Sequence, residues 1–161
     1  MCSDKTKNVP YVESVPYKLA ETCRISELMA RNYYKDFVIG EECVLDLDEF
    51  RILSHIISNP DLSQSDISKL VYKGKAHVGK ILNSMAQKGY IKRVLSTNKN
   101  IMVKHTVLTE YGEKLYYKTN EMFRKLGSNV LDSFTDKEIE SFLYLLGKFQ
   151  NSILEKYKIY F

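Results

Sequence analysis

The sequence has no tryptophan, and only three prolines and three cysteines occur among its 161 residues. The cysteines (Cys2, Cys23 and Cys43) are odd in number and include no closely spaced pair, which argues against a disulfide framework and a structural zinc site. No segment approaches the roughly 18 uncharged apolar residues of a membrane span, and the first residues lack the apolar stretch of a secretory signal. We therefore expect a cytoplasmic protein in a reducing compartment, without membrane contact.

Several signatures of chemistry are also missing. The three histidines (His55, His77 and His105) have no paired ligand spacing, so no metal site is predicted. The sequence contains no glycine-rich phosphate loop, no G-x-S-x-G motif and no paired carboxylates in an apolar context. We expect no catalytic residues and no cofactor. With 44% hydrophobic and 27% charged residues, the composition is that of a folded globular chain.

Acidic residues are absent from one long segment. Residues 67–109 contain no Asp or Glu but carry nine Lys or Arg, whereas the remaining 118 residues carry 15 basic and 20 acidic side chains. Solvated protein surfaces normally mix both signs, although a lysine-rich solvated face is the alternative explanation. A domain-sized block of positive charge is typical of a surface that binds a polyanion such as nucleic acid.

The apolar spacing predicts helices for most of the chain. After an irregular arm at residues 1–16, one helix is expected at about 17–37 and a short pair follows within residues 47–71. A further helix is expected at 75–88, and two long helices follow Thr109 and Thr135. Three capping boxes mark helix starts: Asp46 with Glu49, Ser63 with Asp66, and Thr135 with Glu138.

Between the fourth and fifth helices the apolar period changes from 3.6 to 2. This change predicts strands at 90–95 and 102–108, joined by a polar tip at 96–101. Helix, short helix, turn, helix and hairpin together make a winged helix-turn-helix. The expected fold class is mainly α with a small β-hairpin wing, and residues 45–108 form the candidate DNA-binding domain.

The second helix of such a unit is the one that enters the DNA major groove. Here its polar face combines lysine, histidine, serine and asparagine, which suit contacts with base edges and phosphates. The candidate DNA-binding residues on this helix, on the helix before it and on the wing are Ser63, Gln64, Lys73, Lys75, His77, Lys80, Asn83, Ser84, Arg93, Asn98 and Lys99.

Four segments in this order resemble the MarR family of transcription regulators: LSQSDI (62–67), VGKIL (78–82), KGYIKR (88–93) and VLTEYG (107–112). The resemblance implies a homodimer, with residues 17–44 and 109–161 as a helical dimerisation region, acting on a pseudo-palindromic duplex. It also implies release of DNA by a small-molecule or redox signal, as in a repressor. Family members carry a wing arginine, but this sequence has none near residues 100–102.

Three alternatives stay open. Cys23 lies where peroxide-sensing members of the family carry a reactive cysteine, but a lone cysteine is also typical of a buried hydrophobic position. The aromatic residues of the first and fifth helices indicate a ligand pocket or, alternatively, a core or dimer interface. The whole unit is alternatively a winged-helix adaptor that binds proteins, since fold does not fix function. The broad apolar stripe of the last helix favours a homodimer.

Overall fold

The computed structural model describes residues 9–38, 45–98 and 101–160, and the chain divides into two compact units, 1–43 and 44–161. In the first unit a 3-10 turn (η2, Tyr11–Glu13) leads into one long helix, α1 (Val15–Val38). The helix therefore begins inside the arm expected at residues 1–16. Pro16 does not prevent this, because backbone N–H groups of a first helical turn have no partner within the helix.

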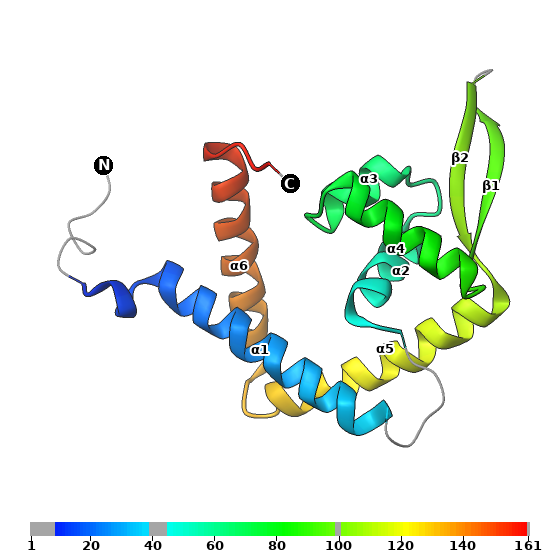
Figure 1. The fold of residues 1–161 in the computed structure, drawn as a ribbon. Coiled ribbons are helices and arrows are strands. Elements are labelled where there is room, and N and C mark those ends of the chain that lie inside the picture. Colours follow the sequence, from blue (N-terminus) through cyan, green and yellow to red (C-terminus); the bar gives the residue numbers. More distant parts are fainter. Residues whose placement is uncertain (1–8, 39–44, 99–100, 161) are drawn as a thin grey trace. The chain divides into compact units, whose positions relative to one another are not determined.

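The second unit has the predicted order of elements (Figure 1). The expected fold class, mainly α with a β-hairpin wing, is confirmed. Figure 1 shows the two strands as a narrow projection next to the end of α4. The elements are α2 (Leu47–Ser58), α3 (Gln64–Leu70), α4 (Lys75–Gln87), β1 (Ile91–Asn98), β2 (Ile101–Leu108), α5 (Glu110–Leu131) and α6 (Asp136–Lys156).

All three predicted capping boxes are present. In each, the cap side chain accepts a hydrogen bond from the backbone N–H three residues on, and the acid there accepts one from the N–H of the cap. Asn59 ends α2 immediately before Pro60, as expected for a residue that proline keeps out of the helical region. The caps thus fix where α2, α3 and α6 begin.

The core of the second unit lies where the helices of the helix-turn-helix meet the base of the hairpin. The buried apolar residues of α2 and α4 include Leu53 and Ile56, and Val78, Leu82 and Met85, which recur at intervals of three and four, whereas Leu70 of α3 is 42% exposed. The buried apolar residues are Leu45, Ile52, Leu53, Ile56, Ile67, Val78, Leu82, Met85, Tyr90, Ile91, Leu115 and Met122.

One corner joins α4, the wing and α5. The hydroxyl of Thr109 donates to the carbonyl oxygen of Gly89 at 2.6 Å and accepts from the N–H of Gly112 at 3.0 Å. The Thr109 N–H also donates to the carbonyl oxygen of Tyr90 at 3.0 Å. Gly89 has a φ of 75°, the left-handed conformation that closes a helix. The start of α5 is therefore tied to the entrance of the wing.

The wing is an antiparallel pair whose register runs from Ile91 opposite Leu108 to Asn98 opposite Ile101. The strands are longer than predicted, because residues 96–98 and 101, expected in the tip, belong to the strands. Paired residues lie on the same face of the hairpin. Ile91 and Thr106 are buried, so the face that they share is the inner one.

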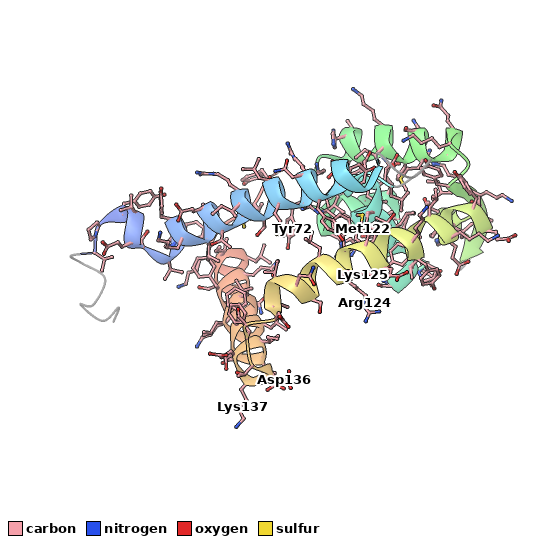
Figure 2. The ribbon with its side chains drawn as sticks, turned by 90° about the horizontal axis from the view of Figure 1, so that it is seen from below. Tyr72, Met122, Arg124, Lys125, Asp136 and Lys137 are labelled. Carbon is pink, nitrogen blue, oxygen red and sulfur yellow. The ribbon has the colours of Figure 1, made fainter. Side chains whose placement is uncertain are left out.

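The long helices α5 and α6 follow the wing. Met122 of α5 is buried, whereas Arg124 and Lys125, labelled on the same helix in Figure 2, are exposed. Phe50 of α2 stacks on Tyr116 and Phe123 of α5, with ring centroids 5.5 and 5.0 Å apart. Within the described part of the chain, no helix is apolar enough over sufficient length to cross a membrane.

Candidate nucleic-acid interface

The polar face of α4 is open to solvent. Lys75, His77, Lys80 and Asn83 are exposed, and Ser84 is half-buried. The opposite face holds the buried Val78, Leu82 and Met85. The structure thus places five of the predicted residues together on one helix, all outside its apolar stripe.

The start of α4 is suited to an anion. Gly74 at the N-cap makes no side-chain cap, and the first turn contains no acidic residue. Unpaired backbone N–H groups and the helix dipole give such an end a partial positive charge, to which Lys75 adds a full one. A phosphate group next to this turn would find donors and charge in the same place.

Three of the predicted residues already have partners within the protein. Lys73 Nζ donates to Asp48 Oδ2 of α2 at 2.8 Å. The Gln64 side-chain amide donates to the carbonyl oxygen of Lys75 at 3.1 Å. Ser63 caps α3. These groups hold the helix-turn-helix together in the free protein, which the sequence prediction did not foresee.

The Ser63 hydroxyl is engaged on both sides. It donates to Asp66 Oδ2 at 2.5 Å and accepts from the Asp66 N–H at 3.2 Å. Its hydrogen bond is the main cause that holds the pKa of Asp66 below its ordinary value, followed by the bond from the Ser63 N–H. The proton of Ser63 is therefore used inside the capping box.

On the wing, neighbouring basic residues differ in their surroundings. Arg93 pairs with Thr106 on the inner face, and its Nη2 atom is buried without a hydrogen-bond partner. Lys92 lies on the outer face and is exposed. The sequence interpretation chose Arg93 and missed Lys92. The strict alternation of a strand that begins with a buried Ile91 was the signal that would have separated them.

Two further wing residues, Asn98 and Lys99, were predicted to bind DNA. Asn98 is the last residue of β1, opposite Ile101. Lys99 lies outside the described residues, as do Cys2 and Cys43.

Cys23 lies on α1 and is exposed as a free thiol, so burial does not account for it within this unit. Tyr116 and Phe123 pack against Phe50, as expected of residues in the contact between α2 and α5. In the described ranges, no three His, Cys, Asp or Glu side chains gather in the way that a metal ion requires.

Buried apolar packing behind α4, an exposed basic face in front of it and a hairpin beside it define a winged helix-turn-helix protein. The model of the MarR family matches residues 45–98 of this chain. The chain as a whole has the fold of MarR-family transcription regulators. No curated protein sequence matches this chain significantly.

Solved structures share this fold over nearly the whole chain. A DNA complex of MepR from S. aureus is 18% identical, with a TM-score of 0.73 over 89% of this chain and 99% of that one. A MarR/EmrR family regulator from Acinetobacter sp. ADP1 is 23% identical, with a TM-score of 0.67 over 86% and 97%. The PcaV regulator from Streptomyces coelicolor, solved with its natural ligand, is 11% identical, with a TM-score of 0.70 over 89% and 96%.

Proposed function

We propose that this protein is a sequence-specific double-stranded DNA-binding transcription regulator, acting as a homodimer on a pseudo-palindromic operator. The observation that carries the proposal is the exposed face of α4, where Lys75, His77, Lys80 and Asn83 stand on a helix within the segment 67–109 that contains no acidic residue. That the similar MepR was solved in complex with DNA supports this role.

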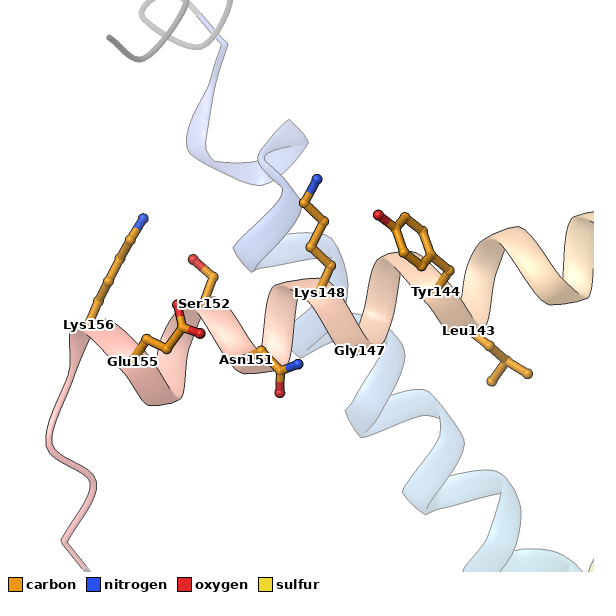
Figure 3. Close-up of a pocket in the computed structure, with 8 residues that line it drawn as sticks. All are labelled: Leu143, Tyr144, Gly147, Lys148, Asn151, Ser152, Glu155 and Lys156. Atoms are coloured by element: carbon orange, nitrogen blue, oxygen red, sulfur yellow. The ribbon is translucent and has the colours of Figure 1, made fainter.

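The homodimer is supported by the surface of α6. None of its residues is buried in this subunit, although Phe142, Leu143 and Leu145 are apolar. An open hollow of about 720 Å³ runs along the helix, with a described lining that comes from α6 itself (Figure 3). Figure 3 shows Tyr144 and Leu143 extending from opposite sides, so apolar surface is not confined to one narrow stripe. A two-fold dimer is the usual way to cover such a helix.

Light scattering tests the dimer. We expect twice the mass of the chain at micromolar concentration. Leu145→Lys should shift the protein toward monomer because it places a charge in the proposed interface, whereas Glu140→Lys, at a polar position of the same helix, should not. A parent protein that is monomeric with intact helical content would contradict the dimer.

A small-molecule signal that releases DNA, and hence a repressor role, is proposed by analogy with PcaV, whose structure holds its natural ligand. Redox release through Cys23 is a separate proposal. It requires that peroxide release DNA from the parent protein but not from Cys23→Ser.

The DNA-binding proposal is tested by selecting duplexes from a random pool and comparing the selected duplex with a scrambled one at two salt concentrations. Each phosphate contact contributes about −0.9 to the log–log salt slope. Lys80→Ala should weaken the free energy of binding to the selected duplex by about 1–3 kcal/mol. The ratio of its affinities for the selected and the scrambled duplex should therefore fall. Lys99→Ala should weaken binding to both duplexes equally and reduce the magnitude of the salt slope by about one unit.

Lys137→Ala is the matched control, because it removes one exposed lysine from the start of α6 (Figure 2). Selection of no duplex above background would contradict the proposal and favour a winged-helix adaptor. If Lys99→Ala loses the preference for the selected duplex while Lys80→Ala keeps it, the wing and not α4 is the element that recognises the DNA sequence.

A further inference from the structure

Two neighbouring acidic residues in the first turn of α2 hold the two lysines that flank α4. Asp48 Oδ2 accepts from Lys73 Nζ at 2.8 Å, and Glu49 Oε1 accepts from Lys88 Nζ at 2.6 Å. Lys73 lies two residues before the first residue of α4, and Lys88 is its C-cap. We call these two ion pairs, Asp48–Lys73 and Glu49–Lys88, the α4 clasp.

The acidic side of the clasp is fixed in place. Glu49 is only 3% exposed, and its second carboxylate oxygen accepts from the N–H of Asp46 at 3.2 Å. The Asp46 side chain in turn accepts from the N–H groups of Asp48 and Glu49. Each oxygen of Glu49 thus has its own donor, and the capping box that starts α2 also orients the carboxylate that meets Lys88.

The basic side is restrained as well. Lys88 Nζ lies 5.5 Å from the centre of the Tyr90 ring, in cation–π contact. The side chain of Lys73 is only about one-third exposed, as is that of Asp48. Both lysines belong to the basic segment 67–109, so two of its nine positive charges are matched by acids from a different helix.

We propose that Asp48 and Glu49 are positioning residues for sequence recognition by α4. The inference rests on the proposed DNA binding. The clasp fixes α4 at both ends against α2, and it holds two flexible lysines away from phosphates. Without it, these lysines bind any duplex and α4 is held mainly by its apolar stripe. Affinity for random DNA then rises while the advantage of the specific site falls.

Asp48→Asn is the main test, because it removes the negative charge with little change of shape. It also keeps the backbone N–H of residue 48, which donates a hydrogen bond to the Asp46 side chain. We expect binding to the scrambled duplex to strengthen, and its salt slope to steepen by about 0.9 for each freed lysine. The ratio of selected to scrambled affinity should fall by roughly threefold to tenfold, the effect of about one hydrogen bond.

The double variant Asp48→Asn/Lys73→Ala should return the salt slope to the parent value. Asp61→Asn, which changes net charge equally at an exposed position between α2 and α3, is the matched control. If Asp48→Asn steepens the slope no more than Asp61→Asn, the proposal is wrong.

A second measurement needs no DNA. Mild acylation of lysines, followed by mass spectrometry, should label Lys73 more slowly than the exposed Lys75 and Lys80. Asp48→Asn should raise the labelling rate of Lys73 alone, and Glu49→Gln that of Lys88 alone. Equal rates in the parent would overturn the clasp. A parent whose lysines follow this pattern but which selects no duplex would instead refute the proposed function.

Discussion

The carbonyl oxygen of Tyr90 lies so close to the α-carbon of Gly112 that any β-carbon at that position would overlap it. Gly112 is buried in the first turn of α5, and Tyr90 leads into β1. Because the atom in the way is backbone, no side-chain rotation relieves the overlap. The close approach is what allows Thr109 to hydrogen-bond to the carbonyl oxygens of Gly89 and Tyr90.

We therefore expect Gly112→Ala to lower the free energy of unfolding by about 3 kcal/mol, at the upper end of overpacking effects. Gly127 lies on the same helix with no atom within 4 Å of a built β-carbon. Gly127→Ala should stabilise by up to about 1 kcal/mol through helix propensity. Urea denaturation of both variants at one protein concentration measures this. If the two substitutions change the free energy of unfolding equally, the backbone between Tyr90 and Gly112 can shift to admit a methyl group.

Tyr72 adopts a left-handed backbone conformation, with a φ of 53°, in the turn between α3 and α4. Its hydroxyl accepts a hydrogen bond from the Gln150 side-chain amide at 3.0 Å. A β-carbon makes this conformation unfavourable by roughly 1–2 kcal/mol. Tyr72→Gly and Tyr72→Ala remove the same ring and the same hydrogen bond, so they differ mainly in the backbone.

We expect Tyr72→Gly to be more stable than Tyr72→Ala by about 1 kcal/mol. Thermal denaturation of the two variants, side by side, checks the difference. If alanine proves the more stable, the turn does not need a positive φ.

The capping box of α3 makes stability depend on pH in a defined direction. Hydrogen bonds from Ser63 lower the pKa of Asp66 from 3.8 in its unperturbed state. A carboxylate with a lowered folded-state pKa stabilises the protein above its unfolded-state pKa, and that stabilisation is lost as the pH falls through the folded-state value. The stabilisation by Asp66 is therefore lost below about pH 4.

Ser63→Ala removes the hydroxyl that both donates and accepts in this box. The difference in unfolding free energy between parent and Ser63→Ala should be largest near neutral pH and should shrink below pH 3.8. Ser63→Thr keeps the hydroxyl and should follow the parent throughout. A difference that stays constant down to pH 2.5 would mean that Asp66 does not contribute to it.

Local signals predicted the fold well. The capping boxes that begin with Asp46, Ser63 and Thr135 each depend on residues three positions apart, and all three are present. Glycine after α4 and the change of period at the wing are equally local. The first helix begins at Val15, inside the arm expected at residues 1–16, and Pro16 fits there because proline is compatible with a first helical turn.

The site was predicted less completely, because its ion pairs join distant parts of the chain. Asp48 meets Lys73 across 25 positions, and Glu49 meets Lys88 across 39. The sequence shows the lysines as a uniform positive block, but it does not show that acids from α2 reach two of them. Gln64, chosen for DNA, similarly has a carbonyl partner 11 residues away.

The wing offers a direct comparison of two adjacent basic residues. Lys92 is exposed on the outer face of the hairpin, whereas Arg93 lies on the inner face with Nη2 buried. A phosphate contact requires an accessible charge, so we expect Lys92→Ala to weaken binding to selected and scrambled duplexes alike. Its salt slope should become shallower by about one unit.

Arg93→Ala should instead lower the stability of the protein. Arg93 is half-buried with Nη2 fully buried, so truncation should lower the free energy of unfolding by about 1–2 kcal/mol and leave the salt slope unchanged. Denaturation and two-salt binding measurements on both variants separate the two effects. A shallower slope with full stability in Arg93→Ala would show that the guanidinium turns outward to DNA, and would restore Arg93 as the phosphate contact that its charge suggested.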